Sequence, residues 1–240
     1  MRTAILAILL AATSPATPPL PRDTIPTAQG PLEVTFIGHG TLMFTWQGHV
    51  IHVDPWSRLA DYAALPKADL VLVTHAHSDH LDPAALALVR RPTTTVVAAP
   101  DCAGKIEGAV ILANGATHSA AGAHITAVPA YNLVHRRDDG RPYHLKGAGN
   151  GYLLTFGDVA VLVAGDTEDV PELRTLGGVQ VAFLPMNLPY TMTPEMVAAL
   201  ARALRPRILY PYHYGDTDPQ RLVELLADTP AIEVRVRPMR

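Results

Sequence analysis

Thr74-His-Ala-His-Ser-Asp-His80 constrains the structure of this 240-residue chain more tightly than any other segment. It follows the apolar run Leu70–Val73, whose length and composition predict a buried strand. Three histidines and an aspartate therefore leave the end of one strand together. Imidazole nitrogens and carboxylate oxygens are ligands for zinc, iron and manganese, so this pattern predicts a metal site. A polar surface loop with chance histidines is the alternative.

The spacing within this segment favours two ions rather than one. His75 and His77 are two residues apart and can share one ion, whereas Asp79 and His80 project differently and can hold a second. Two neighbouring ions can stabilise both the attacking and the leaving group of a hydrolytic displacement. We therefore expect two divalent metal ions, most simply Zn²⁺, with Mn²⁺ or Fe²⁺ as alternatives.

Strands and helices alternate on both sides of the motif. Each of the dipeptides Asp82-Pro83, Thr193-Pro194 and Asp218-Pro219 combines a capping residue with a first-turn proline, and they predict helices through Val89, Leu204 and Ala227. Strands are expected at 33–37, 41–46, 49–53, 95–99, 125–128, 152–156, 159–163, 181–184 and 207–210.

Residues 40–54 resemble residues 151–166, because each is a glycine-turned hairpin whose second strand ends in an aspartate, Asp54 or Asp166. Two related halves would pack as two mixed sheets face to face with helices outside, an α/β fold of four layers. Equivalent strand ends would then meet at one edge, where we place the metal site. A chance match of two hairpins is the alternative.

The length and composition favour a globular protein with one main domain, residues 33–240. Apolar residues make up 48% of the chain, the net charge is −3, and no lysine- or arginine-rich run is present. Nucleic acid is therefore not expected as a partner, whereas a small-molecule substrate is. The single cysteine, Cys102, excludes an internal disulfide and is expected to be a packed thiol.

The N-terminal residues have the features of a targeting signal. Met1-Arg2 is followed by a short apolar run and by Ser14-Pro15-Ala16, which predicts a signal peptide over residues 1–16 and a periplasmic or secreted protein without a stable membrane anchor. Residues 17–32 are rich in proline, which predicts a linker to the mature domain. An ordinary frayed N-terminus is the alternative.

Together these residues resemble the metallo-β-lactamase-fold hydrolase superfamily. Its Thr-His-x-His-x-Asp-His motif is matched by residues 74–80, and Asp54-Pro55, Gly165-Asp166-Thr167 and Tyr212-His213-Tyr214-Gly215 match other motifs in order. The segments 38–41, 54–56, 128–132 and 190–193 are similar to the branch of ascorbate-6-phosphate lactonase-like and uncharacterised metal-dependent hydrolases. The resemblance implies an αβ/βα sandwich with a metal pair at its edge.

The resemblance also implies a role for each ligand. His75 and His77 would bind the first metal; Asp79, His80 and His213 would bind the second; and Asp166 would bridge both. The first metal needs one more histidine, for which His144 and His135 compete. We favour His144, because Lys146-Gly147 and a predicted strand follow it closely, whereas His135 lies in a loop among charged residues.

Metal ions lower the pKa of bound water from about 15.7 toward 7, so a water between two ions would supply a hydroxide nucleophile. The resemblance to the lactonase-like branch implies that this hydroxide cleaves an ester-like bond, either a lactone or a phosphoester. Asp79 could also accept the proton of that water. His39, between two glycines, could line the pocket or form a hydrogen bond to a ligand, or else it could serve only in a turn. Asp54 is expected to hold the free ring N–H of a ligand histidine, or else to stabilise an Asp-Pro turn.

The pocket rim is the least constrained part of the prediction. Five residues on segments near the proposed edge are expected to contact substrate: Tyr131, Asn132, His135, Tyr190 and Met192. Two other functions remain open at this point. The same scaffold can hold iron and act as an oxidoreductase, or it can bind metal without catalysis.

Overall fold

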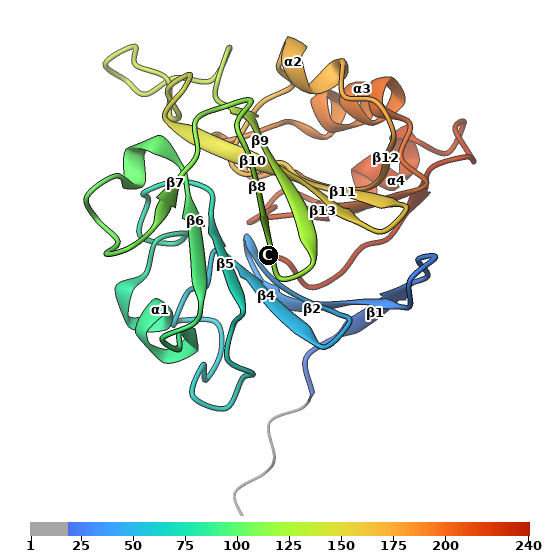
Figure 1. Cartoon of the computed structure of the whole chain (residues 1–240). Coiled ribbons are helices and arrows are strands. Elements are labelled where there is room, and N and C mark those ends of the chain that lie inside the picture. The colour runs from blue at the N-terminus through green and yellow to red at the C-terminus, as the bar shows by residue number, and fades with distance from the viewer. Residues whose placement is uncertain (1–18) are drawn as a thin grey trace, which may run out of the picture.

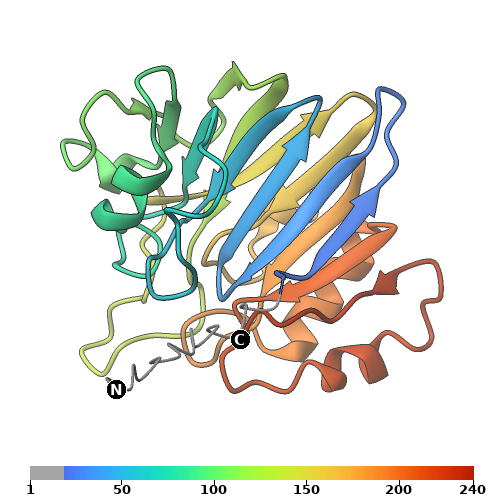
Figure 2. The same cartoon turned by 90° about the horizontal axis from the view of Figure 1, so that it is seen from below.

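The computed structural model describes residues 19–240, and its centre consists of two seven-stranded mixed sheets packed face to face (Figures 1 and 2). The first sheet contains, in spatial order, β1 (Arg22–Ile25), β2 (Leu32–Gly38), β3 (Thr41–Trp46), β4 (His49–Val53), β5 (Leu70–Val73), β6 (Thr95–Ala98) and β7 (Val110–Ile111). The second contains β14 (Glu233–Val234), β13 (Ile208–Tyr212), β12 (Val179–Pro185), β11 (Val159–Val163), β10 (Gly149–Phe156), β9 (Ala123–Ala130) and β8 (Thr117–Ala120).

The helices lie outside the two sheets, as expected for four layers (Figure 1). They are α1 (Pro83–Val89), α2 (Pro171–Arg174), α3 (Pro194–Leu204) and α4 (Gln220–Leu225), with a 3₁₀ helix at Pro100–Cys102. Asp82 accepts hydrogen bonds from the N–H groups of Ala84 and Ala85, and Thr193 accepts one from Met196, so two predicted helix starts are confirmed. The helix predicted from Asp218 is shorter than expected.

The two sheets repeat one topology. In each, the first four strands along the chain are antiparallel and the last three continue in parallel. The β3–β4 hairpin therefore occupies the same place in its sheet as the β10–β11 hairpin, which explains the sequence similarity of residues 40–54 and 151–166. Asp54 and Asp166 follow these equivalent hairpins.

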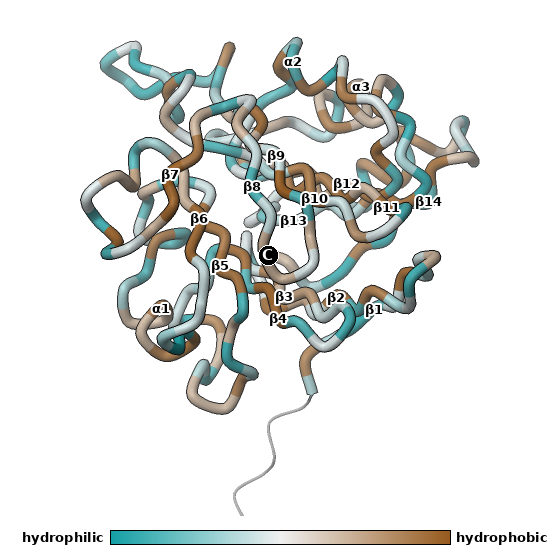
Figure 3. The backbone as a smooth tube through the Cα atoms, viewed as in Figure 1, coloured by the Kyte–Doolittle hydropathy of each residue, from teal (hydrophilic) through white to brown (hydrophobic). Residues whose placement is uncertain are grey.

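Alternation along β5 shows how the layers are built. Leu70 and Leu72 point into the core between the sheets, whereas Val71 and Val73 point into a second core beneath α1. The strand is apolar throughout because both of its faces are buried. The brown, hydrophobic tube at the centre of Figure 3 follows these buried strands.

The expectation of a linker at residues 17–32 is wrong for the described part of that segment. Residues 22–25 form the edge strand β1, which pairs with β2, and Ile25 is fully buried. Pro21 and Pro26 flank the strand instead of interrupting it, and an edge strand tolerates their missing N–H groups. The predicted signal peptide, residues 1–16, lies outside the described residues. Between residues 19 and 240 no helix has the length and apolarity needed to cross a membrane.

Asp23 ties β1 to the C-terminal segment, and this contact gives a first prediction. Its carboxylate accepts hydrogen bonds from the Tyr210 hydroxyl at 2.6 Å and from Arg237 Nη2 at 2.8 Å. Burial raises the pKa of Asp23, but these hydrogen bonds and the positive charge of Arg237 and Arg235 outweigh burial and lower the pKa below 3.8. Because hydrogen bonds to charged groups contribute about 1.5–3 kcal/mol, Asp23→Asn should lower the free energy of unfolding by about that amount at pH 7.

The lowered pKa of Asp23 in the folded state also determines how the stabilisation by this residue depends on pH. The stabilisation is present above the unfolded-state pKa and is lost as the pH falls through the folded-state pKa. Urea unfolding of the wild type and of Asp23→Asn, measured from pH 7 downward, should therefore show a difference in the free energy of unfolding that shrinks below pH 3.8. A difference independent of pH would contradict this role of the Asp23 carboxylate.

Candidate metal centre

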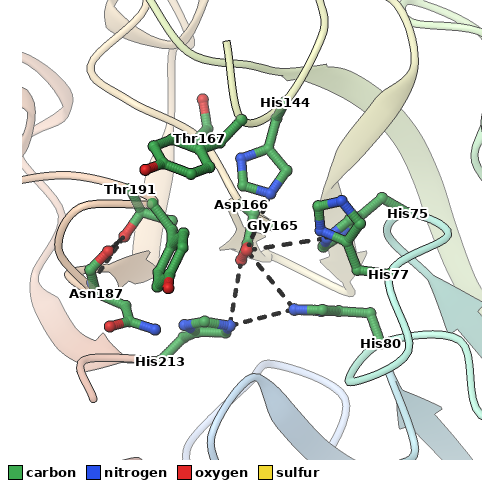
Figure 4. Close-up of polar contacts among 12 residues, drawn as sticks. His75, His77, His80, His144, Gly165, Asp166, Thr167, Asn187, Thr191 and His213 are labelled. Carbon is green, nitrogen blue, oxygen red and sulfur yellow. Dashed lines mark hydrogen bonds and ion pairs between the residues drawn. The ribbon is translucent and has the colours of Figure 1, made fainter. Parts of the chain in front are cut away.

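The predicted ligands converge at one edge of the two sheets, where several strands end (Figure 4). The loop after β5 supplies His75, His77, Asp79 and His80, and the remaining ligands come from the second sheet and its loops. Asp166 follows β11, His213 follows β13, and His144 lies in the loop between β9 and β10.

His75, His77 and His144 form one compact group, with one ligand atom of each within 4.8 Å of the others. His75 Nε2 lies 3.0 Å from His77 Nδ1, and His144 Nε2 lies 3.3 Å from Asp166 Oδ2. Ligands about 2.0–2.1 Å from a tetrahedral ion are separated by about 3.3 Å, so these spacings fit a shared ion. His144 Nε2 is also buried without a hydrogen-bond partner in the described chain, as expected of a metal ligand.

A second group lies beside the first and contains Asp79, His80 and His213, together with His39. His80 Nε2 lies 3.2 Å from His213 Nε2, and Asp79 Oδ2 lies 3.6 Å and 3.8 Å from these two atoms. These distances allow one ion to contact all three side chains.

Asp166 lies between the two groups. Its Oδ2 is 3.9 Å from His75 Nε2 and 3.7 Å from His80 Nε2, and its Oδ1 is 3.6 Å from His213 Nε2. Oδ1 is buried without a hydrogen-bond partner among the described residues. A carboxylate between the two groups could contact an ion held by either of them, so its position is compatible with the bridging role that the resemblance implies.

Two hydrogen bonds orient the ligand rings. His80 Nδ1 lies 2.8 Å from Asp54 Oδ2, and His144 Nδ1 lies 2.8 Å from Asn132 Oδ1. Since both partners are acceptors, each Nδ1 carries a proton and each Nε2 faces the cluster, where it can bind a metal ion. Asp54 also accepts hydrogen bonds from the backbone and hydroxyl of Thr74. Asp54 therefore holds a ligand histidine as expected, in a left-handed conformation with φ of 45°.

The electrostatics of the cluster favour cations. Burial lowers the pKa of His80, but the negative charges of Asp166 and Asp54 outweigh burial and raise it to about 9. Burial raises the pKa of Asp166, but His213 and His80 hold it well below its usual range. Burial lowers the pKa of His75, which keeps its imidazole neutral. The buried carboxylates thus hold a proton on His80 in the absence of metal, and a divalent ion that binds there would take the place of this proton.

Glu168 anchors the loop that carries His144, and the sequence did not reveal this role. Its buried carboxylate accepts hydrogen bonds from the N–H groups of Leu133, Val134 and His135 and from Asn132 Nδ2 at 3.0 Å. Asn132 in turn orients His144. The available signal was its position two residues after Asp166.

Removal of the Asn132 side chain gives a second prediction. Asn132→Ala leaves the His144 ring without its Nδ1 acceptor, and loss of such a supporting partner lowers metal affinity about 10- to 100-fold. Competition with a chromophoric chelator would measure the change, and circular dichroism would show whether the fold is retained. Unchanged affinity in a folded variant would contradict this role.

His39 holds Asp79 in place. Its Nε2 lies 3.1 Å from Asp79 Oδ2, and its ring packs against His213 with a centroid separation of 3.8 Å. His39 thus contacts two predicted ligands of the second ion, a closer association with the metal site than a position on the pocket wall.

Two adjoining cavities of about 190 and 300 Å³ open beside the ligands. Of the five residues expected to contact substrate, Tyr190 lines the larger one and is 45% exposed. The sequence did not single out Arg137, Tyr143 or Asn187, which also line it. Their segments carry no recognisable motif, so their position depends on how the loops fold over the site.

The structure corrects three of the remaining rim predictions, those of Met192, Tyr131 and Asn132. Met192 has no exposed surface and belongs to the core between the sheets, so it cannot contact substrate. Tyr131 is buried and donates a hydrogen bond to Glu172. Asn132 is buried behind His144, and His135 Nδ1 lies 2.7 Å from Glu168 Oε1. The three buried side chains are used for packing and support instead, whereas His135 is 22% exposed and its contact with substrate stays a prediction.

The chain is similar in sequence to known proteins over most of its length. Residues 33–213 match the family described as the Beta-lactamase superfamily domain. A UPF0173 metal-dependent hydrolase of Thermococcus kodakarensis is 31% identical over 215 residues, which cover 82% of this chain and 93% of that protein. A UPF0173 metal-dependent hydrolase of Koribacter versatilis is 30% identical over 200 residues, with coverages of 77% and 84%.

A solved structure extends the similarity to three dimensions. A protein of Parabacteroides distasonis assigned as a metal-dependent hydrolase superimposes with a TM-score of 0.88 at 46% sequence identity. The match covers 92% of this chain and all of that one. Sheets, helices and the edge that carries the metal ligands therefore lie within the shared fold.

Proposed function

Because this chain belongs to the metallo-β-lactamase superfamily of metal-dependent hydrolases, we propose that it binds two divalent metal ions and hydrolyses an ester-like bond of a small molecule. The observation that carries this proposal is the pair of ligand groups, His75–His77–His144 and Asp79–His80–His213, with Asp166 between them. Two ions would use every donor in these groups, whereas a single ion would leave buried donors unused.

Each residue of the cluster has a separate task. When bound, the metal ions would lower the pKa of a coordinated water and polarise the bond to be cleaved. Asp79 lines the larger cavity and is held by His39, so its carboxylate is positioned to accept a proton from the attacking water. Asp54 and Asn132 keep the rings of His80 and His144 aligned throughout.

The cavity supports a small substrate. Its volume of about 300 Å³ lies at the lower end of the range for small-molecule pockets, about 300–1,000 Å³. Similarity to the lactonase-like branch favours a lactone or a phosphoester as the bond cleaved. The predominance of histidine among the ligands favours Zn²⁺ over harder ions, which prefer all-oxygen sites.

Reconstitution of the metal-free protein tests this function. Turnover of a panel of lactones, phosphodiesters and N-acyl amides should rise with added Zn²⁺ and reach its maximum at two equivalents per chain. Saturation at one equivalent would contradict the two-ion site. Oxygen consumption by the iron-loaded protein without hydrolysis of any panel member would favour an oxidoreductase instead.

A further inference from the structure

Arg137 lies in the wall of the cavity beside the metal ligands. It belongs to the loop between β9 and β10 and lines the 300 Å³ cavity together with Tyr143 and Tyr190. Arg137 and Tyr143 also line two further cavities, of about 420 and 270 Å³, which we call the outer cavities. A molecule entering the metal centre from these outer cavities therefore passes the guanidinium of Arg137.

The hydrogen-bond partners of three neighbouring arginines distinguish Arg137 from the others. Arg136 donates to the backbone carbonyls of Gly140 and Leu133, and Arg141 pairs with the carboxylate of Asp139. The Arg137 side chain donates one hydrogen bond, of 3.4 Å, to the Tyr143 carbonyl, and within residues 19–240 it forms no ion pair. A guanidinium carries five N–H donors. Most donors of Arg137 are thus free to bind a ligand.

Aromatic packing holds this guanidinium in position. Its central carbon lies 5.1 Å from the centroid of the Tyr143 ring, and Tyr143 packs edge to face against Tyr190 with centroids 5.0 Å apart. Stacking of this kind restricts the side chain of an arginine before any ligand binds. The two tyrosines also add apolar surface to the wall on either side of the charge.

The charges in the cavity wall indicate what Arg137 binds. The other charged groups there are Asp79 and Asp166, which are predicted metal ligands and would be balanced by the ions. Arg137 is then a positive charge that no carboxylate in the wall of this cavity balances. Asp138 and Asp139 line the larger outer cavity with it, but Asp139 pairs with Arg141, and within the described residues neither aspartate forms an ion pair with Arg137. A planar guanidinium with free donors matches the paired oxygens of a carboxylate or a phosphate.

We propose that Arg137 binds an anionic group of the substrate, a carboxylate or a phosphate, at a position away from the bond that is cleaved. The substrate class is then an anionic ester or lactone, with Tyr143 and Tyr190 packing against the part between the two ends. This proposal rests on the proposed hydrolase function. It makes Arg137 a specificity-determining residue.

Calorimetric titration of the metal-loaded protein tests the anion site without turnover. The probes are glutarate, propyl phosphate and the neutral analogue glutaramide. Because hydrogen bonds to charged groups are strong, Arg137→Gln should weaken binding of the preferred anion about 10- to 100-fold, and Arg137→Lys should weaken it less. Arg136→Gln is the matched control, because it removes the same charge from the same loop, and it should leave binding unchanged. The stronger of the two anions identifies the recognised group.

Kinetics with paired esters test the same residue during catalysis. The 4-nitrophenyl monoester of glutarate carries a carboxylate, whereas 4-nitrophenyl butyrate is neutral. Arg137→Gln should lower kcat/KM about tenfold or more for the anionic ester, mainly through KM, and change it less than about twofold for the neutral one.

These experiments distinguish a failure of the anion site from a failure of the proposed hydrolase function. Hydrolysis of both esters with equal efficiency, unaffected by Arg137→Gln, would overturn the anion site and leave the hydrolase function in place. Loss of anion binding in Arg137→Gln without hydrolysis of any ester by the wild type would support the anion site and contradict the ester chemistry. Equal weakening in Arg136→Gln would show that general loop charge, and not Arg137, is responsible, which would also overturn the proposal.

Discussion

Asp166→Ala is expected to abolish hydrolysis while the protein stays folded. The side chain is 5% exposed, follows β11, and has predicted ligands of both ions as its neighbours. Its removal takes away the one carboxylate that can contact both ions but leaves the core between the sheets intact. Because bound metal supplies several kcal/mol of transition-state stabilisation, kcat/KM should fall about 10³-fold or more.

Three measurements check this expectation: kcat/KM, bound metal per chain by elemental analysis, and far-ultraviolet circular dichroism. His75→Ala should behave in the same way, since it removes a ligand of the first ion from the same edge. Asp228→Ala, at an exposed surface position beyond α4, is the control and should retain full activity. Full activity in either ligand variant would contradict the two-ion site.

His144→Ala and His135→Ala should have opposite effects on metal content. His144 Nε2 lies 3.3 Å from Asp166 Oδ2, whereas His135 Nδ1 lies 2.7 Å from Glu168 and takes no part in the ligand groups. We expect His144→Ala to lose the first ion and most of its turnover. We expect His135→Ala to retain both ions.

The two variants are well matched, because both histidines lie in the same loop. The backbone N–H of His135 donates to Glu168, that of His144 donates to Asn132, and Asn132 in turn donates to Glu168. Bound metal per chain, measured after dialysis against the same buffer, decides between them. If His135→Ala loses an ion and His144→Ala keeps two, the assignment must be reversed.

Local sequence was sufficient for the elements with strong and simple signals. Leu70–Val73 is apolar at every position, and such a short run before a cluster of ligands is typical of a strand buried on both faces. Asp82-Pro83 and Thr193-Pro194 carry a capping oxygen and a first-turn proline, so the helix starts they predict depend on adjacent residues alone.

Prediction failed where distant residues determine the outcome. β1 consists of four residues between prolines, and it is stabilised by pairing with β2 and by Arg237 near the other end of the chain. Met192 lies in a segment near the site but points into the core. No local pattern distinguishes a loop residue that faces a pocket from one that faces inward.

The sequence by itself indicated the class of fold and six of the seven predicted metal ligands, because His75, His77, Asp79 and His80 lie in one loop, and Asp166 and His213 in recognisable motifs. For the seventh it favoured His144 but left His135 open, and that choice depended on tertiary structure. Packing of the loop between β9 and β10 brings His144 to His75 and His77, turns His135 toward Glu168 and places Arg137 in the cavity wall. The physical reason is that ligand type and spacing are local properties, whereas the direction of a loop side chain depends on contacts between residues far apart in the chain.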